Sequence, residues 1–424
     1  MMSNAWLAAV LLALACSGAS AQEPLLSRPD VSVAMSYLER HHQAHVEKQI
    51  TIAEIAAPGR QEGRRAQFMR AEFQRVGLTG VEIDPEGNVL GWRRGKSPKT
   101  LVIAAHTDTV FPAGTDVKIK RTGSTFAGPG VADDARGLTC LLGLAEALNE
   151  ARISTERTLL FVADVGEEGL GNLHGVKYLF QKSPFRAQIE AFMTIDGTGL
   201  DQIGNRSIGS KRYRVTVKGP GGHSSGDFGI VSPVHALGRV IALVSAFEVP
   251  ASPRTTYNVG LIGGGTAVNA VAFESWLEMD MRSEGAAELA ALEARFLEAV
   301  RQGIDEENRF RAKSGTRLTV DTKLVGDRPV AGTPDEAPLT KAALRATRAM
   351  GVAPRLGAGS TDAGAPMSLG LQAISLGGGG EATGVHSLLE KFESVGAFKG
   401  IQRALLVILA FDESPALAPA QSVR

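Results

Sequence analysis

Residues 101–112, with the sequence LVIAAHTDTVFP, constrain the fold of this chain more than any other stretch. The first five are apolar, as expected of a strand that is buried on both faces of a parallel sheet. His106 and Asp108 follow, and as residues i and i+2 of a strand they point to the same side. Open α/β sheets place their sites at the carboxyl ends of such strands. A buried strand that ends in an ordinary polar turn is an equally good interpretation of this stretch alone.

Two further apolar strands are predicted downstream, and they end in the same way. Residues 158–164 (TLLFVAD) lead into the turn at residues 166–169, and residues 191–195 (AFMTI) lead into Asp196. Helical segments, such as residues 136–151, separate the strands. The pattern predicts a doubly wound α/β domain with a site at the carboxyl ends of its strands.

The hydrophobic pattern changes in the middle of the chain. From about residue 207, strand segments such as residues 213–218 (YRVTVK) alternate polar and apolar residues. About four such strands and two amphipathic helices, at residues 233–249 and 286–301, describe a small α+β sandwich. The buried α/β pattern returns after residue 332. We therefore expect a discontinuous catalytic domain, residues 22–206 and 328–424, with residues 207–327 as an inserted domain.

The N-terminus has the features of an export signal. Residues 6–16 form an apolar run that is too short to span a bilayer, and Ala19-Ser20-Ala21 offers a cleavage site. We predict a signal peptide at residues 1–21 and export to the periplasm, with a lipoprotein site at Cys16 as the less favoured alternative. The mature chain would keep only Cys140, so it would have no intrachain disulfide.

The overall charge balance excludes some partners. Lys+Arg and Asp+Glu number 45 each, so nothing indicates a nucleic acid or a membrane surface as partner.

Residues 30–76 are predicted to be helical. Within them His41 and His45 lie one turn apart, but the HExxH metal pattern is absent, and we interpret them as a solvated helix face.

Five residues are candidate metal ligands, and each lies at the end of a predicted apolar strand or in a glycine-rich turn. They are His106, Asp133, Glu168, Asp196 and His386. Imidazole and carboxylate are normal ligands of Zn²⁺, and this set suits two such ions. Three carboxylates and a bridging hydroxide would balance the charge of two divalent ions, which lets the cluster sit in a partly buried cleft. Asp134 is the alternative to Asp133.

Six motifs around these residues resemble, in their order, those of the M20 metallopeptidases. They are HTDTV at His106, GPGVADDARG at Gly128, GEEGLG at Gly166, IDGTG at Ile195, GGHSS at Gly221 and GVHS at Gly384. The GEEGLG run with the following HGVKYL is most similar to the peptidase T and glutamate carboxypeptidase branch. The resemblance covers the chain from residue 101 to its last predicted helix.

The resemblance implies a role for each matching residue. Asp133 would bridge two Zn²⁺ ions, with Co²⁺ or Mn²⁺ as possible substitutes. His106 and Asp196 would complete one metal site, and Glu168 and His386 the other. Asp108 would support His106, and Glu167 would be the general base. His223 would stabilise the oxyanion in the partner subunit's active site, across a homodimer formed by the inserted domain, and Asn269 and Arg282 would contact substrate.

The implied function is zinc-dependent hydrolysis of amide bonds in short peptides or N-acyl amino acids, by a metal-bridging hydroxide. Water held between two cations loses a proton near neutral pH, and Glu167 could pass that proton to the leaving nitrogen. The alternative interpretation of Glu167 and Glu168 is that they are two solvated carboxylates in a turn, without a catalytic role.

Two alternatives remain from other functional classes. Residues 222–226 (GHSSG) match the GxSxG elbow of serine hydrolases, and Asp362 and His386 follow Ser224 in the chain order of a triad. However, glycine and proline separate the preceding strand from Ser224, and the metal-ligand candidates stay unexplained. The other alternative is a non-catalytic periplasmic peptide-binding protein, which a lost ligand or a lost Glu167 would indicate.

Overall fold

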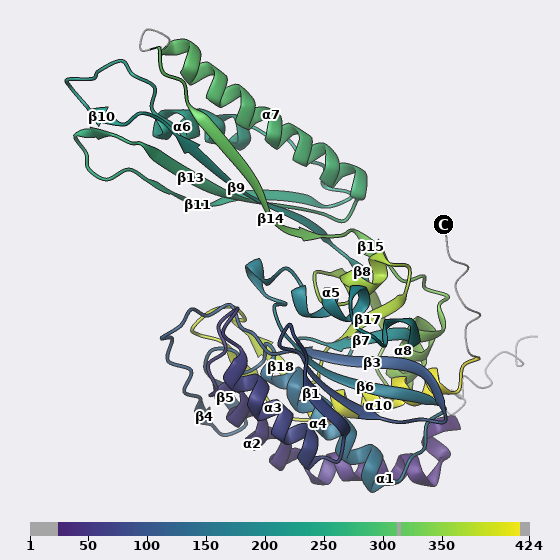
Figure 1. Cartoon of the computed structure of the whole chain (residues 1–424). Coiled ribbons are helices and arrows are strands. Elements are labelled where there is room, and N and C mark those ends of the chain that lie inside the picture. The colour runs from purple at the N-terminus through teal and green to yellow at the C-terminus, as the bar shows by residue number, and fades with distance from the viewer. Residues whose placement is uncertain (1–23, 312–314, 416–424) are drawn as a thin grey trace, which may run out of the picture.

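The protein folds into two lobes (Figure 1). The structure is a computed structural model that describes residues 24–311 and 315–415. The predicted signal peptide lies outside these residues. The chain crosses from the larger lobe to the smaller one after β8 (Gln202–Ser207) and returns at the end of β14 (Thr319–Arg328). The predicted fold, a doubly wound α/β catalytic part with an inserted α+β part, is confirmed.

A nine-stranded mixed sheet forms the centre of the larger lobe, in the order β1-β2-β6-β3-β7-β17-β8-β15, with β16 also paired to β8. Strands β3, β6, β7 and β17 run parallel in the middle, and antiparallel strands flank them. The strands are β1 (Thr79–Ile83), β2 (Val89–Arg93), β3 (Ser97–His106), β6 (Arg157–Asp164), β7 (Ile189–Ile195), β15 (Ala331–Gly332), β16 (Arg355–Gly359) and β17 (Gln372–Leu376).

Helices cover both faces of this sheet, which explains the unbroken apolar run in β3. Leu101, Ile103 and Ala105 join the core on one face, whereas Val102 and Ala104 join the core on the other. The first core includes residues of α1 (Pro29–Arg40), α2 (His42–Ala53), α3 (Gly63–Arg75), α4 (Ala135–Glu150), α8 (Pro338–Ala349) and α10 (Phe398–Asp412). The second includes residues of α5 (His174–Gln181) and α9 (Gly364–Ser368).

A small antiparallel sheet, which the sequence pattern did not predict, connects distant parts of the chain. Its order is β18 (Glu381–Thr383), β19 (Lys391–Glu393), β5 (Thr125–Ala127) and β4 (Lys120–Thr122). Pairing of Phe392 with Phe126 brings the turn that contains His386 beside the loop that contains Asp133.

The smaller lobe is a four-stranded antiparallel sheet with two helices packed on it. The strand order is β11 (Thr255–Gly264), β13 (Glu274–Ser283), β9 (Gly209–Lys218) and β14. Alternate residues of β13 are buried beneath α6 (Pro233–Ser245) and α7 (Ala286–Phe310). A short pair, β10 (Gly222–His223) and β12 (Ala270–Val271), stands apart from this sheet. The role of this lobe in dimerisation or as a lid stays a prediction.

One local interpretation is wrong. His45 does not lie on a solvated helix face, because it is 4% exposed and its Nε2 lies 2.9 Å from Glu146 Oε2. Tertiary packing of α2 on α4 buries this histidine and supplies its carboxylate partner, which helical periodicity alone did not predict. Cys140, also on α4, is a buried free thiol.

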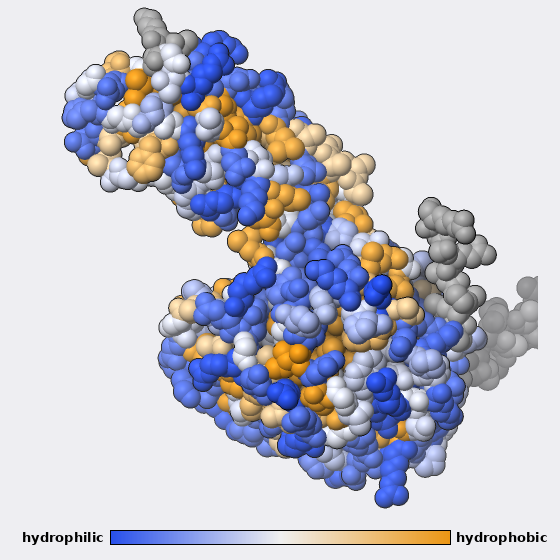
Figure 2. Space-filling view, in the orientation of Figure 1, coloured by the Kyte–Doolittle hydropathy of each residue, from blue (hydrophilic) through white to orange (hydrophobic). Residues whose placement is uncertain are grey.

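The visible surface of both lobes is mainly hydrophilic, with hydrophobic residues in scattered patches (Figure 2). Across residues 24–311 and 315–415, no helix combines the length and apolar character that crossing a membrane requires.

The core of the smaller lobe gives a stability prediction. Phe296 of α7 is fully buried, whereas the next residue, Leu297, is 38% exposed. Phe296→Ala should lower the free energy of unfolding by about 3–5 kcal/mol, because it leaves a cavity against Tyr213. Leu297→Ala should change it by about 0.5 kcal/mol or less. Urea unfolding followed by circular dichroism measures both, and equal losses would contradict this account of the core.

Candidate active site

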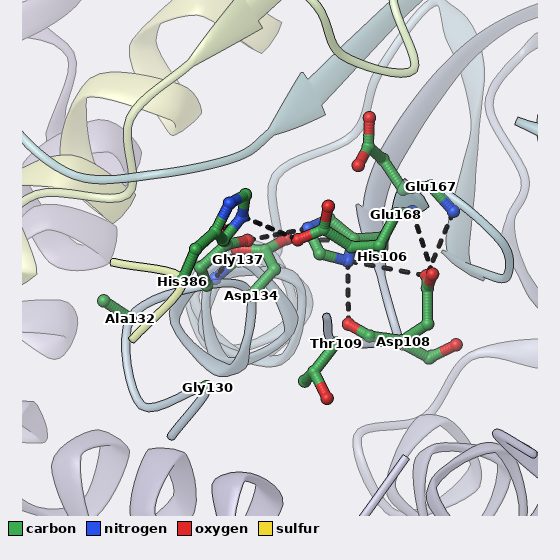
Figure 3. A network of polar contacts seen from close by, with 12 residues as sticks. His106, Asp108, Thr109, Gly130, Ala132, Asp134, Gly137, Glu167, Glu168 and His386 are labelled. Atoms are coloured by element: carbon green, nitrogen blue, oxygen red, sulfur yellow. Dashed lines mark hydrogen bonds and ion pairs between the residues drawn. The ribbon is translucent and has the colours of Figure 1, made fainter. Parts of the chain in front are cut away.

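The five predicted ligands meet at the carboxyl ends of the central strands. His106 ends β3, Glu168 follows β6, and Asp196 follows β7. Asp133 lies in the loop before α4, and His386 lies in the turn between β18 and β19. Figure 3 shows His106, Glu168 and His386 directed toward one another above the start of α4.

Asp133 lies between the two histidines. Its Oδ1 is 2.9 Å from Nε2 of His106, and its Oδ2 is 2.9 Å from Nε2 of His386. The same His386 nitrogen lies 2.8 Å from Oε1 of Glu168. Three sets of ligand atoms lie within 4.8 Å of one another, and they are His106-Asp133-Asp196, Asp133-Glu168-His386 and His106-Glu167-Glu168.

The donor chemistry of this cluster fits divalent metal ions. Burial, followed by the charge of Asp133, raises the pKa of Asp196 to about 8. Hydrogen bonds to Asp133 and Glu168 raise the pKa of His386 to about 10. A buried carboxylate that lies beside other carboxylates stays ionised at neutral pH only when positive charge is also nearby. The first two sets above each combine one imidazole with two carboxylates, as Zn²⁺ sites do.

Of the two adjacent aspartates, only Asp133 joins the ligand sets. The Asp134 side chain caps α4 by accepting a hydrogen bond from the Gly137 amide at 2.9 Å, and it also accepts one from the His106 amide at 3.2 Å. Asp134 therefore anchors the loop that presents Asp133.

Asp108 supports the cluster through both its backbone carbonyl and its side chain. Its carbonyl oxygen lies 3.0 Å from Nδ1 of His106, closer than its carboxylate, at 3.6 Å. With Nδ1 as the donor to this carbonyl, the lone pair of Nε2 faces Asp133. The Asp108 carboxylate accepts hydrogen bonds from the amides of Glu167 and Glu168, at 3.0 and 2.9 Å (Figure 3). It thus fixes the turn that carries both glutamates.

Glu167 is 5% exposed and lies beside the cluster. Its Oε1 is 2.9 Å from Nη1 of Arg328. Burial raises the pKa of Glu167, and the positive charge of Arg328 opposes that rise. The two neighbouring glutamates therefore have different surroundings, and neither is a solvated turn carboxylate.

A cavity of about 360 Å³ opens onto the cluster. All five predicted ligands, Glu167 and Arg282 line it. Arg282 reaches it from β13 of the smaller lobe, with its Nε 2.8 Å from Oδ2 of Asp280. Asn269 and His223 lie elsewhere in that lobe, beside each other near β10 and β12, and do not line this cavity.

The structure does not assemble the alternative serine triad. Ser224 lies next to β10 in the smaller lobe, where its amide donates to the Asn269 carbonyl. Asp362 is buried beside Asp164, and His386 contacts Asp133 and Glu168 instead. Among the described residues, Ser224 makes no hydrogen bond with His386.

Two supporting residues were missed by the sequence analysis. The Glu390 carboxylate accepts backbone hydrogen bonds from Gly130, Ala132 and Asp133, at 3.0, 2.7 and 3.2 Å. Arg328 binds Glu167. Neither residue belongs to one of the six sequence motifs, so no local pattern marked Glu390 or Arg328.

Residues 102–410 match the sequence profile of peptidase family M20/M25/M40. The chain belongs to this family. Members of the family are hydrolytic enzymes that depend on a dinuclear metal centre, in agreement with the cluster around Asp133. All five predicted ligands lie within the matched residues.

Two curated relatives are similar over part of the chain. Carboxypeptidase G2 of Pseudomonas sp. (strain RS-16) is 24% identical over 51% of this chain and 53% of its own length. Succinyl-diaminopimelate desuccinylase of Legionella pneumophila (strain Paris) is 27% identical over 51% of this chain and 62% of its own length. This chain thus spans less than two thirds of either relative.

Solved M20 peptidase structures share the fold over nearly the whole chain. Aminopeptidase PepT of Bacillus cereus superposes with a TM-score of 0.67 at 20% identity, covering 87% of this chain and 98% of that one. The two-lobed arrangement is therefore the arrangement of a known peptidase.

The Glu390 contacts predict a change in metal affinity. Glu390→Gln replaces one carboxylate oxygen with an NH₂ group that cannot accept from a backbone N–H, so the loop that presents Asp133 should loosen. We expect the affinity for Zn²⁺ to fall about 10- to 100-fold, as for other residues that orient metal ligands. Competition with a chromophoric chelator measures it. Glu381→Gln, at an exposed position of β18, is the matched control, and equal affinities in both variants would contradict the role of Glu390.

Proposed function

We propose that this protein is a dinuclear zinc hydrolase that cleaves amide bonds of short peptides or N-acyl amino acids. The observation that carries the proposal is the convergence of two histidines and three carboxylates around Asp133, in a cavity that also contains Glu167 and Arg282. When bound, two Zn²⁺ ions would polarise the amide carbonyl and lower the pKa of water. His106 and Asp196 would hold one ion, Glu168 and His386 the other, and Asp133 both.

Glu167 is the proposed general base. Its carboxylate would take a proton from the attacking water and then give it to the nitrogen of the leaving amine, so that the C–N bond breaks without expelling an amide anion. Burial, which raises its pKa, supports the second step because it makes the protonated form accessible.

Arg282 is the proposed contact for a substrate carboxylate. Arg282 and Arg212 both pair with the single carboxylate of Asp280, at 2.8 Å each, which leaves one positive charge in excess at the cavity. The Arg282 side chain is 41% exposed and has terminal nitrogens available for a bidentate contact. This charge favours substrates with a free carboxylate, as small peptides and N-acyl amino acids have.

We further propose a homodimer in which His223 of one subunit stabilises the oxyanion in the active site of the other, with Asn269 beside it. His223 is exposed, and its Nδ1 accepts from the amides of Ser225 and Gly226, at 3.3 and 3.2 Å. That pattern assigns the proton to Nε2, which makes His223 a donor toward an incoming group.

Residues 1–21 support the proposal that the enzyme is exported to the periplasm.

Removal of the base tests the proposed chemistry. Glu167→Gln should lower kcat for dipeptide hydrolysis about 10²- to 10⁴-fold while two Zn²⁺ ions stay bound, whereas the exposed Glu284→Gln should not. Steady-state kinetics and metal analysis measure this.

Exhaustive chelation should abolish hydrolysis, and Zn²⁺, Co²⁺ or Mn²⁺ should restore it. Full activity of Glu167→Gln or of the chelated enzyme would exclude the proposal.

The role of Arg282 predicts a substrate-dependent loss. Arg282→Ala should raise KM about 10- to 100-fold for a dipeptide with a free C-terminal carboxylate, because a charged hydrogen bond is lost. The same dipeptide with a C-terminal amide serves as the internal control and should show little change in KM. Equal changes in KM for the two substrates would show that Arg282 does not bind the substrate carboxylate.

A further inference from the structure

We propose that Arg328 is a positioning residue that holds the Glu167 carboxylate in its working orientation. This inference rests on the proposed role of Glu167 as general base. Arg328 also lines the cavity, and we assign its effect on the reaction to its contact with Glu167.

The guanidinium of Arg328 contacts Glu167 at two points, the carboxylate and the backbone carbonyl. Nη1 of Arg328 lies 2.9 Å from Oε1 of the carboxylate, and Nη2 donates to the backbone carbonyl of the same residue. Nη1 also donates to Oγ and the carbonyl oxygen of Ser360, at 3.0 and 3.2 Å. The side chains of Arg328 and Glu167 are 5% and 6% exposed. Because water is largely excluded, the charged contact is stronger than a surface pair would be.

The local chain needs such a partner. Glu167 lies in a turn between Gly166 and Gly169, which both have positive φ, at 75° and 51°. Its neighbour Glu168 is held by His386. A glutamate side chain has several rotatable bonds, and a carboxylate without a fixed partner would sample several rotamers. Among the described residues, Oε2 of Glu167 has no hydrogen-bond partner, so the contact of Arg328 with Oε1 leaves the other oxygen available to take a proton.

Arg328 also ties the general base to the junction of the two lobes. It is the last residue of β14, where the chain returns to the larger lobe. The preceding residue, Asp327, donates its amide to Oδ1 of Asn172 at 2.8 Å, and Arg212 of β9 donates to the Gly169 carbonyl. The turn with the two glutamates is therefore bound by strands of the smaller lobe on both sides, and Arg328 is the contact that reaches the carboxylate.

The test compares Arg328→Met and Arg328→Lys with Arg214→Met. Arg214 lies on β9, in the same lobe, and pairs with Glu278, not with the turn. We expect Arg328→Met to lower kcat about 100-fold, as for a misplaced catalytic group, with KM within about threefold of the parent and two Zn²⁺ per chain retained. Arg328→Lys should have a kcat between those of Arg328→Met and the parent, because lysine keeps the positive charge but cannot make both contacts with Glu167. Arg214→Met should leave kcat unchanged.

A raised KM with an unchanged kcat, loss of Zn²⁺, or equal rates for Arg328→Lys and Arg328→Met would overturn the inference. If Arg328→Met does not fold, Arg328→Lys in the Glu167→Gln background decides. If Arg328 acts through Glu167, the double variant should have the same kcat as Glu167→Gln alone. If Arg328 acts independently, the two losses of kcat should multiply. Full activity of Glu167→Gln would refute the proposed function itself. Impaired Glu167→Gln with unimpaired Arg328 variants would refute only the role of Arg328.

Discussion

The site depends on the placement of one carboxylate between two imidazoles. Each oxygen of Asp133 faces a different histidine at 2.9 Å, one from the central sheet and one from a turn near the C-terminus. Glu168 and Asp196 add two further carboxylates to the same small volume. Buried negative charges at such spacing are unfavourable unless cations balance them. The geometry therefore fits divalent metal ions, whose charge would balance these carboxylates.

Most of the surrounding polar residues serve to hold this arrangement. Asp134, Asp108 and Glu390 are chemically like the proposed ligands, yet their carboxylates accept backbone amides. An acidic side chain surrounded by N–H donors becomes a structural anchor, whereas one that faces imidazoles and other carboxylates becomes a ligand candidate. The difference lies in what the backbone presents to each side chain, and it separates two adjacent residues, Asp133 and Asp134.

The sequence predicted the parts of the site that depend on local pattern. Strands β3, β6 and β7 are apolar on both faces and end in polar residues, so the strands and the edge where their ends meet followed from hydrophobic runs. The small sheet did not follow, because its strands have three residues each and pair across the chain. His386 was assigned to the second metal site from family resemblance alone. Arg328 was missed, and His45 was misinterpreted, because their partners lie more than 100 positions away.

Anomalous X-ray diffraction at the zinc edge, on crystals grown with Zn²⁺, tests the central claim most directly. The account predicts two peaks on either side of Asp133, one beside His106 and Asp196 and the other beside Glu168 and His386. A single peak, or peaks coordinated by Asp134 or Glu390 in place of Asp133, would contradict it.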